Sequence, residues 1–267
     1  MARKHSEGYE GWDEYAPFYD WENARTLGRR DVPFWRTVGL GAGGTALELG
    51  CGTGRIAMPL GRAGVSLVGI DRSDAMLARA RRRVHRARLT GRVSLVRGDI
   101  RALPFPLAAF SLVIAPYGVL QSLLRERDLA ATLRAVHGVL RPGATFGVEL
   151  VADLPSWDEY RKRISLTGWK NRRGGAHVTL VETVRQDRAR HLTIFDQEFT
   201  ERIGRVRRTR RFALTFRTLS VPQMARRLEK AGFEITALLG DYQGAAWDAR
   251  AEVWIILAQR PGTTRTP

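Results

Sequence analysis

The chain has 267 residues, of which 44% are hydrophobic and 27% charged, and it contains one cysteine. This length supports one large or two modest hydrophobic cores, and a single Cys excludes an intramolecular disulfide framework and any multi-cysteine metal or iron–sulfur site. No run approaches the roughly 20 apolar residues of a membrane span, and the N-terminal sequence lacks a signal-peptide core, so we expect a soluble, cytoplasmic protein.

The formal net charge is +17, and the basic surplus is concentrated in two ranges. Residues 72–101 carry ten Arg against two acidic residues, and residues 160–211 carry fifteen Arg or Lys against five. Basic surfaces attract nucleic acid, anionic lipid heads or acidic small molecules. The first range is largely explained by one solvated face of an amphipathic helix.

The first 40 residues are rich in aromatic side chains, and the sequence from residue 45 alternates between short β runs and amphipathic helical runs. We predict N-terminal helices that pack on the main body. Strands are predicted at 45–50, 66–71, 93–99, 110–116 and 144–151, and helices at 55–64, 74–89 and 126–140. This alternation predicts a parallel, doubly wound sheet.

The alternation stops after residue 152. Residues 177–218 read as several β runs without helices, which predicts an antiparallel insertion over one end of the sheet. A helix is expected to begin at Ser220, because Ser220 and Gln223 are spaced as a capping box and Pro222 suits a first turn. Two strands, at 233–240 and 252–260, end the predicted fold.

The segment ALELGCGTGR at 46–55 places a glycine-rich turn between a strand and a helix. Glycines there allow close approach of a ligand to backbone N–H groups at a helix N-terminus. The spacing is GxGxG rather than the GxGxxG of dinucleotide-binding folds, which makes a pyrophosphate clamp the weaker interpretation.

Acidic residues stand at or near the ends of three successive predicted strands: Glu48, Asp71 and Asp99. Carboxyl ends of parallel strands meet in one crevice, and an acidic residue about 20 positions after the glycine turn can accept the hydroxyls of a ribose. Helix capping explains Asp71 or Asp99 singly but explains the set of three less easily.

Over residues 45–151 the sequence resembles the class I S-adenosylmethionine (SAM)-dependent methyltransferases. The resemblance rests on five motifs, ELGCGTG, GIDRSDAML, VRGDIRALPF, FSLVIAPYGVLQSL and LRPGATF. It implies an α/β, Rossmann-like sheet of seven mostly parallel strands with the last strand antiparallel, and SAM as the methyl donor, S-adenosylhomocysteine being the product.

The resemblance also implies positions around SAM. Gly50, Cys51 and Gly52 would pass the methionyl part, with Glu48 near its ammonium group. The remaining carried-over positions are Asp71 at the ribose, Arg72 and Met76 beside the adenine, Asp99 with the Ile100 N–H at the adenine edge, Ala115 and Pro116 near the sulfonium, and Tyr117 near the substrate.

The N-terminal segment YAPFYDWENARTLGRRDVPFW is similar to the lid of small-molecule methyltransferases of the aminosugar and glycine N-methyltransferase type. Tyr15 or Tyr19 would then face the methionyl part, and Arg29 its carboxylate. Simple packing of the aromatic residues is the alternative. The implied division is a helical lid at 1–40, a core at 41–152 with its end at 220–260, a β cover at 153–219 and a disordered tail at 261–267.

Methyl transfer needs a nucleophile in line with the donor, and a general base for a hydroxyl acceptor. We take Tyr117, His177 and Tyr242 as the catalytic candidates, and Glu149, His191 and Asp241 as further possible bases. Packing in the insertion is the favoured role of the two His residues. No metal is expected, and Cys51, inside the turn, is expected to be buried.

These features favour methyl transfer to N or O of a small molecule by a monomer or homodimer. The basic residues of 160–211, beside the expected substrate entrance, would favour an acidic or phosphorylated substrate. An RNA or DNA methyltransferase is the alternative, although Ile-Ala-Pro-Tyr at 114–117 departs from the [DNS]-P-P-[YFW] motif that grips a flipped base. A SAM-binding protein without catalysis would need a degraded glycine turn. No apolar anchor supports a membrane role.

Overall fold

The computed structural model describes residues 11–26, 28–152, 157–170 and 175–262. Most of the tail predicted at 261–267, and residues 1–10 of the predicted lid, therefore lie outside the described residues. Within the described part of the chain, no helix is both long and apolar enough to span a membrane.

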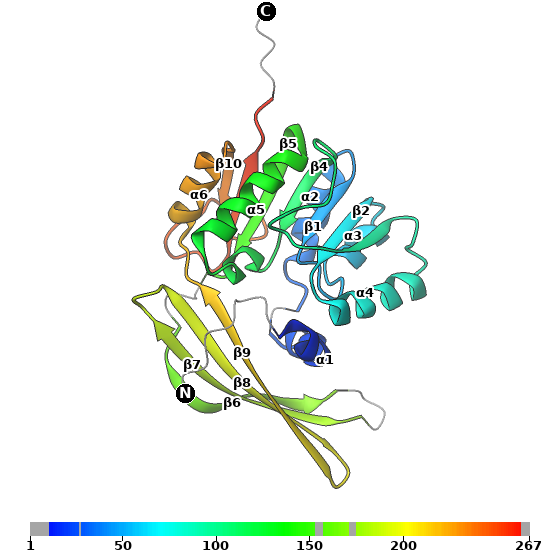
Figure 1. Ribbon diagram of the computed structural model, residues 1–267, viewed down its shortest axis with the longest axis vertical. Coiled ribbons are helices and arrows are strands. Elements are labelled where there is room, and N and C mark those ends of the chain that lie inside the picture. The colour runs from blue at the N-terminus through cyan, green and yellow to red at the C-terminus, as the bar shows by residue number, and fades with distance from the viewer. Residues whose placement is uncertain (1–10, 27, 153–156, 171–174, 263–267) are drawn as a thin grey trace, which may run out of the picture.

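A seven-stranded sheet forms the main body (Figure 1). Its order is β10-β11-β5-β4-β1-β2-β3, and β11 is antiparallel to both of its neighbours while β1 to β5 are parallel. The predicted fold class is thus confirmed. The strands are β1 (Ala46–Leu49), β2 (Leu67–Asp71), β3 (Val93–Arg97), β4 (Phe110–Ala115), β5 (Leu140–Leu150), β10 (Glu234–Leu239) and β11 (Trp254–Gln259).

Helices cover both faces of this sheet, because successive strand residues point to opposite sides. Val113 of β4 belongs to a core cluster with residues of α5 and α6, whereas Leu112 and Ile114 belong to a second cluster with α2, α3 and α4. The helices are α1 (Trp12–Asn23), α2 (Val32–Gly41), α3 (Ala57–Arg62), α4 (Asp74–Arg86), α5 (Glu126–Val139) and α6 (Val221–Lys230), with a 3₁₀ turn η1 (Val119–Ser122). The predicted capping box of Ser220 and Gln223 is present at α6.

A separate antiparallel sheet, which we call the cover sheet, confirms the predicted insertion. Its strands, in spatial order, are β6 (Tyr160–Trp169), β7 (His177–Asp187), β8 (Leu192–Ile203) and β9 (Val206–Arg217). The sequence analysis missed β6. This strand lies at the edge and most of its residues are exposed, so its sequence lacks the apolar alternation that identifies a half-buried strand.

Helix α1 lies between the two sheets and is tied to both (Figure 1). On the cover side, Phe18 stacks on Phe199 with 4.4 Å between ring centroids. On the core side, the hydroxyl of Thr53 donates to Asp20 Oδ1 over 2.6 Å, and the hydroxyl of Ser73 donates to Asp13 Oδ1 over 2.5 Å. The helix therefore joins the glycine turn and the start of α4 to the cover sheet.

Candidate functional site

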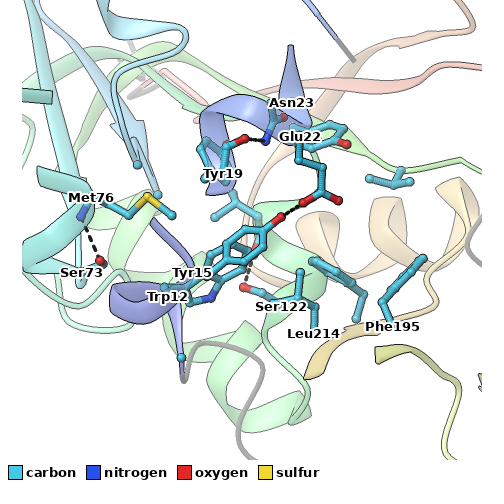
Figure 2. Close-up of a pocket in the computed structure, with 18 of the residues that line it drawn as sticks. Trp12, Tyr15, Tyr19, Glu22, Asn23, Ser73, Met76, Ser122, Phe195 and Leu214 are labelled. Carbon is cyan, nitrogen blue, oxygen red and sulfur yellow. Dashed lines mark hydrogen bonds between the residues drawn. The ribbon is translucent and has the colours of Figure 1, made fainter. Parts of the chain in front are cut away.

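A cavity of about 1120 Å³ opens between the carboxyl ends of β1 to β4, helix α1 and the cover sheet (Figure 2). Small-molecule sites usually have volumes of about 300–1,000 Å³, so this cavity has room for two ligands side by side. Most of the predicted cofactor positions line it, namely Tyr15, Tyr19, Glu48, Gly50, Cys51, Gly52, Asp71, Arg72, Met76, Asp99, Ile100 and Pro116.

The glycine turn after β1 depends on backbone angles that only glycine adopts easily. Gly50 has a φ of 60° and Gly52 a φ of 52°. A Cβ on Gly50 would come within 2.4 Å of a methyl carbon of Val119, so this position also has no room for a side chain. Cys51 between them is buried, and burial raises the pKa of its thiol, which keeps it neutral.

Glu48, in β1, is a buried carboxylate at the floor of the cavity. Its side chain is 2% exposed, and its Oε2 atom has no hydrogen-bond partner among the described residues. Burial raises the pKa of Glu48 to about 8. A buried acceptor without a donor, next to a glycine turn, suits the ammonium group of an amino acid moiety.

Asp71, at the end of β2, is held in place by the backbone. One carboxylate oxygen accepts the Gly52 N–H and the other accepts the Ser73 N–H, each over 2.8 Å. Burial raises the pKa of Asp71. Each oxygen keeps further acceptor capacity, so this residue can take hydroxyl groups of a ligand at a fixed point of the cavity.

Asp99, after β3, lines the same cavity but has a cationic partner. The Arg101 guanidinium donates to Asp99 Oδ2 over 2.7 Å, and Arg72 lies 3.6 Å from the same oxygen. The hydrogen bond from Arg101 lowers the pKa of Asp99. The arginine pairing, which the sequence analysis did not foresee, leaves Asp99 a weaker acceptor for an adenine amino group than Asp71 is for hydroxyls.

One face of α1 forms a wall of the cavity. Tyr15, Tyr19 and Glu22 point into it from α1, and Phe195 and Leu214 of the cover sheet lie opposite (Figure 2). The spacing of 15, 19 and 22 places these side chains on one helix face. The hydroxyl of Tyr15 donates to Glu22, and a Cβ on Gly52 would lie 3.8 Å from the Tyr19 ring. The face therefore reaches from the glycine turn to the cover sheet.

Two predicted cofactor positions do not line the cavity. Ala115 is fully buried in the sheet, and Arg29 is exposed at the surface, whereas its neighbour Arg30 lines the cavity. Arg55, which the sequence analysis missed, also lines it and forms a two-point ion pair with the buried Asp31, at 2.6 and 2.8 Å.

The three catalytic candidates separate in the structure. Tyr117 lines the cavity and has a left-handed backbone with φ of 50°. Tyr242 is outside the lining, where its hydroxyl donates to Glu149 over 2.6 Å. His177 is also outside it, with its ring edge-on to Trp169.

Glu149 itself is a structural carboxylate. Besides the Tyr242 hydroxyl it accepts the Tyr117 N–H over 3.0 Å and the Trp35 indole N–H over 3.3 Å. The other two possible bases lie away from the cavity lining: His191 in the turn between β7 and β8, and Asp241 as a half-buried acceptor of two backbone N–H groups.

Two polar residues of the cover sheet, Glu182 and Gln197, were also missed. They are 6% and 4% exposed, and they pair directly across β7 and β8 on the inner face. A signal for Glu182 was present in the sequence, since it interrupts an alternating apolar row of Val178, Leu180 and Val184. A charged residue in such a row marks a buried polar site.

Part of the chain resembles known methyltransferases in sequence. A family model described as a methyltransferase domain matches residues 46–143. Among curated relatives, a C-methyltransferase of ubiquinone and menaquinone biosynthesis from Geobacter sulfurreducens is 31% identical over 49% of this chain and 53% of its own length. A sterol 24-C-methyltransferase from Aspergillus fumigatus is 29% identical over 49% of this chain and 33% of its own length. The chain thus spans about a third to a half of these relatives.

Solved structures resemble the whole chain. The CcbJ methyltransferase from Streptomyces caelestis has a TM-score of 0.78 at 22% identity, covering 97% of this chain and 100% of its own. A SAM-bound amino pentose methyltransferase from Micromonospora echinaspora has a TM-score of 0.66 at 18% identity, covering 91% and 96%. At these identities the likeness shows a shared fold over most of the chain.

Proposed function

We propose that this protein, whose residues 46–143 match a methyltransferase-domain model, transfers a methyl group from SAM to an N or O atom of a small molecule. The observation that carries this proposal is the single cavity that runs from the glycine turn to the cover sheet. SAM, when bound, supplies an electrophilic methyl group and leaves as S-adenosylhomocysteine.

The residues at the core end of the cavity fit SAM. The unpartnered carboxylate oxygen of Glu48 suits the ammonium group of the methionyl part, and Asp71 presents acceptors for the ribose hydroxyls. The turn at Gly50 to Gly52 lets the ligand approach the backbone closely. Tyr19 and Tyr117, both lining the cavity, would close this end against water.

The basic surplus does not gather at the cavity, which argues against a nucleic-acid substrate. Six arginines of the β8–β9 hairpin (Arg202, Arg205, Arg207, Arg208, Arg210 and Arg211) are exposed and are not among the lining residues. Of the described basic residues in 160–211, Arg163 lines the cavity. A flipped base would need a surplus of cationic groups near the site entrance to hold its phosphates, whereas eight acidic residues and six arginines line this cavity.

Calorimetric titration with S-adenosylhomocysteine tests the cofactor assignment. We expect binding to the wild-type protein and a loss of roughly 10- to 150-fold in Asp71→Ala, the scale of hydrogen bonds to a charged group. Asp74→Ala is the matched control, because Asp74 is more than half exposed, pairs with Arg97 and does not line the cavity. Absence of binding to the wild type, or equal affinity in Asp71→Ala and Asp74→Ala, would contradict the assignment.

Methyl transfer and its acceptor are tested with labelled SAM. We expect label to pass to small amines or alcohols and not to RNA, and the transfer to continue in the presence of a metal chelator. Transfer to RNA that weakens steeply with added salt would instead support the nucleic-acid alternative.

A further inference from the structure

Two carboxylates meet at the cover end of the cavity, on segments far apart in the chain. Gln197 of β8 donates one amide hydrogen bond to Glu22 of α1 over 3.0 Å and another to Glu182 of β7 over 2.8 Å. Tyr15 also donates to Glu22, and both Tyr160 and Ser165 donate to Glu182. All of these residues line the cavity. We call Glu22 and Glu182 the acidic pair, and Gln197 its bridge.

This pair has no cationic partner in the part of the chain that the structure describes, where neither Glu22 nor Glu182 forms an ion pair. Arg163 lies opposite Glu182 in the ladder of β6 and β7, yet its guanidinium sits over the Tyr160 ring, 5.5 Å from the centroid. Burying carboxylates without a cation costs free energy. This cost is reflected in the pKa of Glu22, which is raised to about 7. Burial is the main cause, and the nearby Glu182 carboxylate adds to it.

The bridge carries a second, independent sign of a ligand site. Gln197 is 4% exposed, and its Oε1 atom has no hydrogen-bond donor among the described residues. Both amide hydrogens already point to the carboxylates, so Oε1 remains a buried acceptor that needs a donor. The amide nitrogen bridges the two carboxylates, where a metal ion would need a ligand oxygen instead, so the arrangement suits a hydrogen-bond donor rather than a metal.

Aromatic rings surround this end of the cavity. Trp157 stands edge-on to Phe195 at 4.9 Å, Phe216 lies 5.9 Å from Phe195, and Tyr15 lines the α1 side. Ring faces attract cations and exclude water. A group that carries several N–H donors, a positive charge and an apolar body would satisfy the carboxylates, the free amide oxygen and the aromatic walls together.

We propose that Glu22, Glu182 and Gln197 bind the ammonium group of an amine substrate, and that Glu22 takes the proton which the amine must lose before its nitrogen can be methylated. The proposal rests on the proposed function, whose N or O acceptor it narrows to nitrogen. It also replaces the expected acidic or phosphorylated substrate with a cationic one.

The proton step is balanced within the site. The ammonium R–NH₃⁺ gives one proton to the carboxylate of Glu22, which leaves R–NH₂ with a free electron pair on nitrogen and a neutral Glu22 carboxyl. A base whose pKa lies near neutral pH is well suited to this transfer. The groups that face Glu22 are Tyr15 on its own helix, Tyr117 after β4, and Glu182 and Gln197 on the cover sheet.

Titration with benzylammonium chloride tests the proposal on the full chain, both free and saturated with S-adenosylhomocysteine. Benzyl alcohol and benzyl phosphate are the neutral and anionic probes of the same shape. We expect benzylammonium to bind at least about tenfold more tightly than benzyl alcohol, and Glu22→Gln and Glu182→Gln each to remove that preference. Glu14→Gln, on the same helix and lining the same cavity, is the matched control and should keep it.

Calorimetry in buffers of different ionisation enthalpy adds a readout that a merely structural role would not change. Near pH 7 a cation bound at the pair should drive a proton off Glu22, and Glu22→Gln should abolish this proton release while S-adenosylhomocysteine binding persists. Equal affinity for the ammonium and alcohol probes, a preference for benzyl phosphate, or an unchanged preference in both Gln variants would overturn the amine site. Failure to bind S-adenosylhomocysteine would instead contradict the proposed function, since the probes are also titrated on the free protein.

Discussion

The two ends of the cavity are built in different ways. The core end is made by one stretch of chain, from Glu48 to Tyr117, in which turns and strand ends place backbone N–H groups and carboxylates around a ligand. The cover end brings together Glu22, Glu182 and Gln197, which are up to 175 residues apart in the sequence. Local backbone geometry therefore determines the core end, whereas packing of α1 between two sheets determines the cover end.

Within the cover sheet, the inner face and the β8–β9 hairpin differ in charge. Its inner face presents Glu182 to the cavity, while the β8–β9 hairpin carries six exposed arginines. The net charge of +17 therefore says little about the site, because screening weakens surface charges while a buried pair keeps its full effect. Each prediction below changes one end of the cavity or its support, so that the contrast between them can be measured.

The largest effect is expected from the ring stack that holds α1 on the cover sheet. Phe199 is fully buried against Phe18, so Phe199→Ala should lower the free energy of unfolding by about 3–5 kcal/mol. Phe146→Ala, which removes an equally buried ring from the core sheet, is the matched control and should cost a similar amount. Urea unfolding followed by tryptophan fluorescence measures both; a loss well below that of Phe146→Ala would show that α1 is not fixed by the stack.

Next in size is a pH effect at the cover end. The pKa of Glu22 is raised to about 7 by burial, so its protonated form stabilises the fold below the unfolded pKa and this contribution is lost as pH rises through 7. Glu22→Gln should therefore gain stability relative to the wild type between pH 5 and 8, by up to about 3 kcal/mol.

Denaturant unfolding of both proteins across that pH range measures the difference. Glu48, whose pKa is also raised, is present in both chains and cancels from the comparison. A difference that stays constant with pH would show that Glu22 titrates normally and would weaken its role as a proton acceptor.

The core end of the cavity could largely be predicted from the sequence, because it is built from local patterns. The strand–turn–helix at 46–55 and the acidic strand ends are local patterns, and the predicted positions Glu48, Asp71 and Asp99 all line the cavity. The pairing of Asp99 with Arg101 and the absence of Arg29 from the lining depend on side-chain conformations that no local pattern encodes.

At the cover end, sequence patterns carried less information. The sequence analysis named neither Glu22 nor Glu182, although Glu22 shares a helix face with Tyr15 and Tyr19. The meeting of the two carboxylates through Gln197 requires the docking of α1 on the cover sheet. His177 lies on the predicted sheet, yet the strand register places it beside Trp169 rather than in the cavity.

A smaller effect is expected from the substitution of Tyr242. It tests whether this residue stabilises the core or takes a direct part in the site. Tyr242→Phe removes a donor from the buried carboxylate of Glu149 and should cost about 1.5–3 kcal/mol of stability. Because Tyr242 does not line the cavity, affinity for S-adenosylhomocysteine and for benzylammonium should stay unchanged. Loss of benzylammonium binding without loss of stability would restore Tyr242 as a substrate-site residue.

The smallest effect is expected where α1 meets the core. Asp13 Oδ1 accepts the Ser73 hydroxyl over 2.5 Å and the Ala75 N–H over 3.1 Å at the start of α4, so Asp13→Ala should cost about 0.5–1.5 kcal/mol at neutral pH. The hydrogen bond from Ser73 lowers the pKa of Asp13, so this contribution is present above the unfolded pKa and is lost as pH falls through the folded value. Thermal unfolding at neutral and acidic pH measures this loss of stability. Glu14→Ala, at the exposed neighbouring residue, is the control. An Asp13→Ala cost that persists in acid would mean that α1 is held to α4 by packing alone.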